Sequence, residues 1–324
     1  MGTRMSATIP NRLIMPRYGP RTVIGQLPER STIVGGPDIN SVSFMDSTRH
    51  RAPKHRLPAA IVGVVVRPFG FLARHRQLLL QTSIADVRAR VAASTLGWLW
   101  IALYPLLFLG TYAVVYVYVF RVRFPTMGGT DYVLFIFCGL IPFLWFSESV
   151  SLGTSSVVAN PGLVKNTMYP IDLVPAKSVA ASQATYLFGT SMLLAALAVT
   201  GRLTAWALLW PVMWVLQFVF LVGVAWLAAA ACVFLRDLQQ LVGVALLMLM
   251  MLSPIAYPPD AVPEGLRPFL AMNPLCSMIS AYQDILLRGV FPSSLGVFAA
   301  IAVVTFVLGH VVFSRLKAVF ADHV

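Results

Sequence analysis

Charged residues are scarce in this chain. Only 11% of its 324 residues are Asp, Glu, Lys or Arg, whereas 58% are hydrophobic and the mean hydropathy is +0.79. A soluble domain carries about 25% charged residues. The chain therefore has too few charged groups to cover its own surface toward water. This argues against a soluble enzyme, a disordered protein and a disulfide scaffold.

Common sequence motifs of nucleotide-binding proteins and hydrolases are also absent. None of the four lysines lies in a G-x-x-x-x-G-K-[ST] loop, and neither G-x-S-x-G nor H-E-x-x-H occurs. The cysteines Cys138, Cys232 and Cys276 are isolated, which argues against a zinc site and favours packing residues. The first apolar run of spanning length starts near Thr95, too late for a secretory signal peptide. We expect no catalytic residue, metal or cofactor in this chain.

Long stretches without charge are what the sequence does contain. A helix needs about 20 apolar residues to cross the hydrocarbon core of a bilayer. Six stretches predict membrane spans at about residues 95–120, 132–150, 176–200, 204–233, 239–258 and 291–314. A seventh run at 268–283 is more polar and contains two prolines, which predicts a re-entrant or interfacial hairpin. The predicted fold class is an all-α integral membrane protein with six transmembrane helices.

Ionisable side chains are missing from the middle of these predicted spans. Glu148, at the inner end of the second span, is the nearest exception. A transporter driven by an ion gradient usually carries such groups at mid-membrane. We therefore expect a transport protein whose energy is supplied by something other than this chain. For Glu148, the sequence favours a contact between helices over a role in a proton relay.

Basic residues are unevenly distributed about the predicted spans. Residues 1–94 hold 14 of the 24 basic residues and four of the twelve acidic ones. Six spans put both termini on one side, and a cytoplasmic location gives 19 basic residues inside and five outside. Because cytoplasmic loops of membrane proteins are enriched in Lys and Arg, both termini are predicted to be cytoplasmic.

The basic N-terminal segment divides into two parts. Residues 1–60 lack a sustained apolar period, which predicts a disordered tail. In residues 71–93 four apolar residues share one helical face: Leu80, Ile84, Val87 and Val91. Arg88 and Arg90 flank this face, and Arg76 belongs to the same helix. The pattern predicts an amphipathic helix on the inner membrane surface, with a helix packed on another protein as the alternative.

Aromatic residues recur at every fourth position of the first predicted span. They are Trp100, Tyr104, Phe108, Tyr112, Tyr116 and Phe120. Each step turns about 40° beyond a full helical turn, so the stripe winds slowly around the helix. Since aromatic faces stack on sugar rings, the candidate channel-lining residues are Trp100, Tyr104, Phe108, Tyr112, Phe143 and Trp145. Core packing and interfacial aromatic belts are the alternative.

Proline-bounded segments occur on both sides of the predicted membrane. On the inner side, residues 162–165 fit one or two helical turns, a rigid element suited to transmit the movement of a partner; a passive loop is the alternative. Candidate coupling residues are Asn160, Leu163, Lys165, Tyr169 and Asp172. On the outer side, residues 260–289 predict short broken helices that close the exit. Candidate gate residues are Pro263, Asn273, Pro274, Asp284 and Arg288, the last two spaced for an ion pair that is alternatively an ordinary surface pair.

Six motifs occur in the order in which ABC-2 type polysaccharide-export permeases carry them. They are STLGWLW at 94–100 with Tyr104-Pro105, GLIPFLWF at 139–146, NPGLVKNTMYPIDLVP at 160–175, FLRDL at 234–238, SPIAYP at 253–258, and Asn273-Pro274-Leu275 with Tyr282. From about residue 65 to 324 the chain resembles this family, the transmembrane subunits of O-antigen, teichoic acid and galactan ABC transporters. It departs from the family's aromatic-Pro-Arg-Glu run, because Tyr169-Pro170 is followed by Ile171 and Asp172.

The resemblance implies a subunit of the bacterial inner membrane that works as a homodimer. A separate ATP-binding subunit would bind ATP and Mg²⁺, and the complex would move a polyprenyl-pyrophosphate-linked glycan to the outer leaflet. Arg88 and Arg90 would attract either that pyrophosphate or anionic membrane lipid. No nucleic acid is expected as a partner.

Three alternatives to this function stay open. One is an ABC-2 exporter of drugs or small lipids. Another is a membrane-bound glycan-modifying enzyme, which the sparse carboxylates of the predicted outer loops argue against. The third is a passive assembly scaffold.

Overall fold

The computed structural model describes residues 57–119, 128–165, 168–258 and 262–323, and all regular structure in these residues is helical. The greater part of the tail predicted for residues 1–60 lies outside them. The first described helix, α1, begins at Leu57, inside that predicted segment.

Four long apolar helices form the central bundle. They are α4 (Gly129–Ser155), α6 (Leu173–Val199), α7 (Trp210–Phe234, preceded by the 3-10 turn η2, Ala205–Leu209) and α11 (Leu295–His323). Each is long and apolar enough to cross a membrane. They correspond to the second, third, fourth and sixth predicted spans. α11 runs beyond the predicted end at residue 314, past Arg315 and Lys317.

Two apolar helices are shorter than predicted. α3 covers Leu99–Val114 and continues as the π-helical segment η1, Val115–Val119, whereas α8 covers only Leu238–Leu252. α8 ends early because Ser253 is extended before Pro254, and a residue that precedes proline is disfavoured in helical conformation. At 1.5 Å per residue, its 15 residues span about 22 Å, less than the bilayer core. Four candidate spans and two shorter apolar helices thus stand where six spans were predicted.

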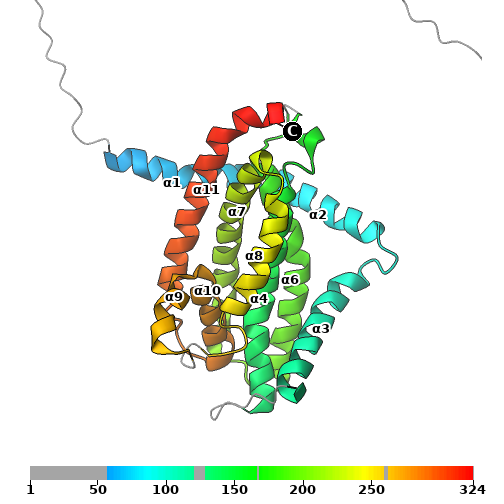
Figure 1. The fold of residues 1–324 in the computed structure, drawn as a ribbon, viewed down its shortest axis with the longest axis vertical. Helices are drawn as coiled ribbons and strands as arrows, with labels where there is room; N and C mark the ends of the chain where they lie inside the picture. The colour runs from blue at the N-terminus through cyan, green and yellow to red at the C-terminus, as the bar shows by residue number, and fades with distance from the viewer. Residues whose placement is uncertain (1–56, 120–127, 166–167, 259–261, 324) are drawn as a thin grey trace, which may run out of the picture. The chain divides into compact units, whose positions relative to one another are not determined.

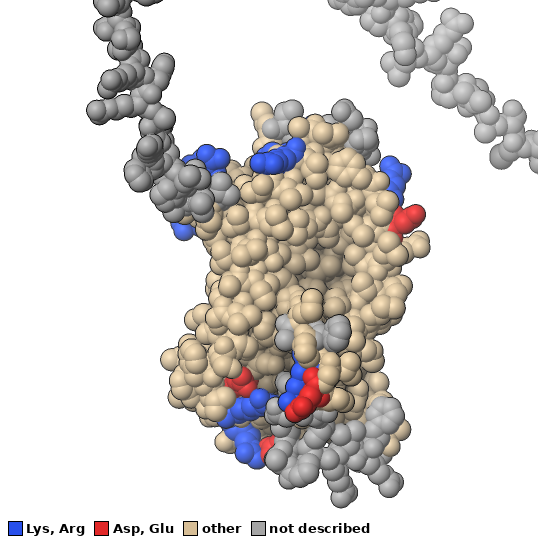
Figure 2. All heavy atoms as spheres, turned by 60° about the vertical axis from the view of Figure 1, so that its left-hand side comes forward, with Lys and Arg blue, Asp and Glu red and all other residues tan. Residues whose placement is uncertain are grey.

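The helix predicted at residues 71–93 is divided between two helices. α1 (Leu57–Arg74) and α2 (Arg76–Ala92) are separated at His75, and Figure 1 shows both crossing the end of the bundle that carries the C-terminus. α1 packs against α11, and α2 packs against α6. On the face drawn in Figure 2, charged side chains gather toward the two ends, with a broad uncharged band between them. This arrangement fits a bundle that is surrounded by lipid at mid-height.

Glycines permit the closest helix contact in the bundle. α7 and α11 share the most extensive interface between any two helices of the described chain. A Cβ atom added to Gly223 would lie 2.6 Å from the backbone nitrogen of Phe306, and one added to Gly309 would overlap the carbonyl oxygen of Gly223. Small residues at such crossings let backbones approach and replace the hydrophobic driving force that lipid does not supply.

Short helices complete both ends of the bundle. At the end of the bundle where Asp172 pairs with Lys317, α5 is a single turn, Pro161–Val164, at the position of the predicted helical turn between prolines. At the opposite end lie η4 (Glu264–Leu266), α9 (Arg267–Met272), α10 (Pro274–Gln283) and the π-helical η5 (Asp284–Arg288). α10 packs against α4 and α11 and buries most of its side chains.

Candidate functional site

The aromatic stripe of α3 forms a ladder of neighbouring rings. Tyr104 and Phe108 have ring centroids 6.1 Å apart, Phe108 and Tyr112 are 5.3 Å apart, and Tyr112 and Tyr116 are 5.7 Å apart. The last two pairs are stacked, with interplanar angles of 21° and 22°. The hydroxyl of Tyr112 donates a hydrogen bond to the sulfur of Met250 on α8, at 3.2 Å. The ladder therefore faces toward α8.

A cavity of about 540 Å³ lies beside this ladder, between α3, α4 and α8. We call it the aromatic cavity. Its lining residues include Tyr104, Phe108, Phe143, Glu148, Leu246 and Met250. Three of the predicted channel-lining residues thus meet at one cavity. Tyr112 lies one step further along the ladder and lines a smaller cavity with Met250 and Tyr257.

Two predicted lining residues lie elsewhere. Trp145 is only 1% exposed, stacks on Tyr186 at 4.4 Å and donates its indole N–H to Ser182 at 3.1 Å, as a core residue does. Trp100 lines a separate cavity of about 250 Å³, together with Arg90 of α2 and Glu148 of α4.

Glu148 makes the contact between helices that the sequence favours for it. Nη1 of Arg90 lies 3.5 Å from Oε1 of Glu148, so the pair links α2 to α4 across 58 positions of the chain. Both side chains stay partly exposed, at 43% and 30%. The pairing itself is not visible in the sequence, because it depends on how α2 crosses the bundle.

α2 presents two different faces. The face toward α6 carries Leu79 and Ser83, which are buried, and Asp86, whose carboxylate lies 3.0 Å from Nζ of Lys177. Leu80 and Ile84, from the predicted apolar face, are 59% and 50% exposed. Arg76 and Arg88 are also exposed. An exposed apolar strip next to arginines is the pattern of a helix that lies on a membrane surface.

The predicted coupling residues surround α5 and the start of α6. Asn160 precedes α5 and donates from its side chain to the carbonyl of Ser156, Leu163 is partly buried, and Lys165 is exposed. Tyr169 is partly buried against the core. Asp172, which precedes α6, is 3% exposed, and its Oδ2 lies 2.6 Å from Nζ of Lys317 near the end of α11.

We predict strong coupling between Asp172 and Lys317. Removal of either partner leaves a charge without its counter-ion, and for Asp172 that charge is buried, so the double-mutant cycle Asp172→Asn with Lys317→Met should give about 1–3 kcal/mol. Thermal unfolding of the purified variants measures this energy. The exposed pair Arg202–Asp131 at the opposite end is the control, where the same cycle should give below about 1 kcal/mol. Equal coupling in the two cycles would contradict the prediction.

The predicted gate residues lie at helix ends and bends. Pro263 precedes η4, and Asn273 caps α10, because its Oδ1 accepts a hydrogen bond from the backbone nitrogen of Leu275 at 3.0 Å. Pro274 is the first residue of α10. Arg288 and Asp284 form the predicted ion pair, at 3.1 Å. α9 ends and α10 begins at Asn273–Pro274, within the segment where the sequence predicts short broken helices.

The long apolar helices and the uncharged band around them are those of a multi-pass membrane protein. The family model of the ABC-2 type transporter matches residues 79–287. This match covers more than half of the chain, and the protein belongs to the ABC-2 type transporter family.

The relatives with which the chain aligns include proteins of O-antigen export and polysialic acid transport. The chain is 28% identical over 248 residues to an O-antigen export system permease protein RfbA of Klebsiella pneumoniae, across 76% of this chain and 94% of the relative. It is 28% identical over 258 residues to the RfbA of Myxococcus xanthus, across 78% and 97%. The polysialic acid transport protein KpsM of Escherichia coli is 25% identical over 236 residues, across 70% and 88%.

Proposed function

We propose that this chain is the permease subunit of an ATP-driven exporter that moves a lipid-linked polysaccharide across the plasma membrane. The carrying observation is that polysaccharide-export permeases align with it over 88–97% of their own length. The aromatic cavity supports the same substrate class, because stacked rings offer apolar faces to sugars while tyrosine hydroxyls keep polar partners available.

A homodimer is the form in which we propose that the subunit works. Only one residue of α8, Leu246, is buried, whereas one side of the helix is exposed and apolar. The exposed residues are Leu241, Val244, Leu247, Met248 and Met251. A second copy placed against α8 would cover this surface and complete the wall of the aromatic cavity. Exposed apolar surface of this extent fits a protein contact or lipid.

The power source in this proposal is a separate ATP-binding subunit beneath α5. Gly162 of α5 and Lys165, which follows it, are exposed, and residues 168–172 lead to the buried start of α6. ATP and Mg²⁺ belong to that subunit, and this chain then transmits movement rather than making or breaking bonds.

The topology we propose has six crossings, with both termini in the cytoplasm and residues 262–288 as an outer gate. α3 continued by η1 supplies one of the two remaining crossings, and α8, which is shorter than a full span, supplies the other. A reporter active only outside the cytoplasm, fused after Val324, tests the orientation. Reporter activity there would overturn the topology.

Reconstitution tests the function as a whole. The chain and its ATP-binding subunit are placed in vesicles with a lipid-linked polysaccharide, and glycan that appears on the opposite face is measured with a membrane-impermeant lectin. We expect transport that requires ATP and both subunits. Transport without the ATP-binding subunit, or export of small lipids in place of the polysaccharide, would overturn the proposal.

The aromatic ladder gives a sharper prediction. The double substitution Tyr104→Ala and Tyr112→Ala removes two stacking faces worth about 0.5–1.5 kcal/mol each. Export should therefore slow about five-fold or more, while the amount of the protein in the membrane stays unchanged. Export rate is measured in the reconstituted vesicles. Tyr104→Phe with Tyr112→Phe keeps both rings and should stay near the wild-type rate. If the two double variants behaved alike, the rings would have no role in transport.

A further inference from the structure

Two cavities of the protein share Arg90 and Glu148 in their walls. One is the aromatic cavity. The other, of about 250 Å³, lies between α2, the turn after it, α3 and α6, and we call it the side cavity. Both cavities therefore border the same ion pair. No residue of this pair is used by the ladder or by the coupling segment.

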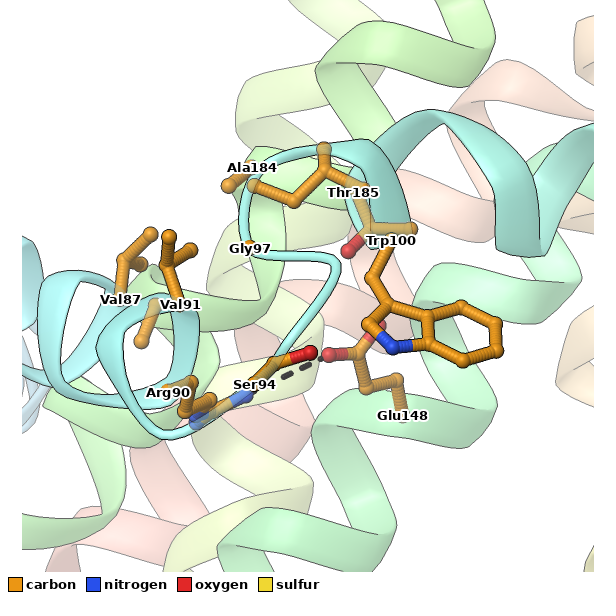
Figure 3. A pocket seen from close by; sticks show the side chains of 11 residues that line it. Val87, Arg90, Val91, Ser94, Gly97, Trp100, Glu148, Ala184 and Thr185 are labelled. Atoms are coloured by element: carbon orange, nitrogen blue, oxygen red, sulfur yellow. Dashed lines mark hydrogen bonds and ion pairs between the residues drawn. The ribbon is translucent and has the colours of Figure 1, made fainter.

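The side cavity combines an apolar wall with a small polar group of side chains. The apolar wall consists of Val87, Val91, Trp100, Ile101 and Ala184. Arg90, Glu148, Ser94 and Thr185 supply the polar groups. In Figure 3 the Ser94 hydroxyl and the Trp100 indole point toward the Arg90–Glu148 pair. This composition suits a molecule with an anionic head and an apolar chain.

A turn fixed by glycine places these groups together. Gly97 has φ +52°, a left-handed conformation that residues with a side chain rarely adopt. The turn reverses the chain between α2 and α3, so Ser94 and Trp100 both line the side cavity from its two sides. An added Cβ would meet only Val91, at 3.8 Å, so the requirement for glycine is one of backbone conformation.

The Arg90–Glu148 pair is weak for a contact at this position. It consists of one hydrogen bond at 3.5 Å between side chains that remain partly exposed. Exposed pairs of this kind contribute little to stability. A diphosphate carries more negative charge than one carboxylate and matches the planar fork of a guanidinium with two parallel hydrogen bonds. Arg90 is therefore held by a partner that a diphosphate can displace.

We propose that the side cavity binds the diphosphate head of the lipid-linked substrate, with Arg90 exchanging Glu148 for phosphate oxygens. Ser94 and Thr185 donate hydroxyl hydrogen bonds to the same head, and the apolar wall contacts the first part of the polyprenyl chain. Glu148 is the competing anion that orients Arg90 while the cavity is empty. This inference rests on the proposed function, and it names the part of the substrate that is recognised first.

Opposite effects of two substitutions identify such a site. Loss of the competitor in Glu148→Gln should tighten binding of a prenyl diphosphate about five-fold, since an exposed pair is worth up to about 1 kcal/mol. Loss of the binding group in Arg90→Gln should weaken it about ten-fold or more, as expected for charge-assisted hydrogen bonds. An ion pair that serves only structure predicts the same direction for both variants.

The experiment uses the full chain in complex with its ATP-binding subunit, in detergent, and farnesyl diphosphate as a soluble probe. Binding is measured by microscale thermophoresis for wild type, Glu148→Gln, Arg90→Gln, the conservative Arg90→Lys and the control Arg74→Gln, an exposed arginine at the end of α1. Farnesyl monophosphate, farnesol and inorganic diphosphate are the comparison ligands. We expect farnesyl diphosphate to bind tightest, Arg90→Lys to be intermediate and Arg74→Gln to match wild type.

Several results would overturn the site. They are a change in the same direction for Glu148→Gln and Arg90→Gln, no change in either variant, and equal binding of inorganic and farnesyl diphosphate, which would point to a free anion. Thermal unfolding of each complex separates loss of binding from loss of fold.

Export by the same complexes separates this inference from the proposed function. Opposite shifts in binding without ATP-driven export of polysaccharide by the wild type would leave the site standing and remove the function. Normal export by Arg90→Gln, with unchanged binding, would remove the site and leave the function standing.

Discussion

A Gly-Ser insertion after Lys165 is expected to abolish export while the protein stays in the membrane. α5 is a single turn whose capping residue is Lys165, and two added residues lengthen the link between α5 and the start of α6. A coupling of about 1–3 kcal/mol corresponds to a 5- to 150-fold change, so its loss should lower export by about five-fold or more. Export in vesicles and the protein level in membranes are measured together.

The control is the same insertion after Gly201, at the opposite end of the bundle. Gly201 has φ +67°, and an added Cβ there meets nothing within 4 Å, so the loop has room to change. Export by this variant should remain close to that of the wild type. Full export with the insertion after Lys165 would refute the coupling role of α5 and favour a passive loop.

Gly309→Leu is expected to have a large effect on folding. A side chain at this position overlaps the carbonyl oxygen of Gly223, a backbone atom that cannot rotate away. Overpacking of a core typically costs about 1–3 kcal/mol, and we expect more than about 3 kcal/mol here because α7 and α11 must separate. The variant should fail to reach the membrane or should unfold at a much lower temperature than the wild type.

Alanine provides a graded comparison on the same helix. Gly309→Ala should also lower the unfolding temperature, whereas Gly296→Ala should leave it near the wild-type value, because nothing lies within 4 Å of a Cβ at Gly296. Fluorescence-detected size-exclusion chromatography after heating measures both. Wild-type stability of Gly309→Ala would show that the two helices have space to move apart.

The sequence predicts the long helices well because absence of charge is a strong local signal. α4, α6 and α11 begin within four residues of their predicted starts, and η2, which leads into α7, begins within one residue of the fourth. The same criterion overestimates α8, since a count of charges does not register that Pro254 ends the helix. The single turn of α5 was predictable from its flanking prolines.

Contacts between distant segments are what the sequence does not reveal. Nothing in the sequence indicates that Gly223 and Gly309 meet, because each is one small residue in an apolar run. α2 was predicted to have an apolar face, but the face it buries against α6 carries Ser83 and Asp86, because Lys177 provides a partner there. Such choices depend on which elements become neighbours in the folded protein.

Two ion pairs connect the start of α6 to two other helices, one through an acidic and one through a basic residue of this segment. Asp172 holds α11 through Lys317, and Lys177 holds α2 through Asp86. A displacement of the start of α6 would therefore move both α2 and α11. Arg90 lies one helical turn beyond Asp86 on α2, so a movement of α2 would also change the distance between Arg90 and Glu148. If α5 receives the ATP-driven movement as proposed, that movement and the opening of the Arg90–Glu148 pair at the side cavity would occur together.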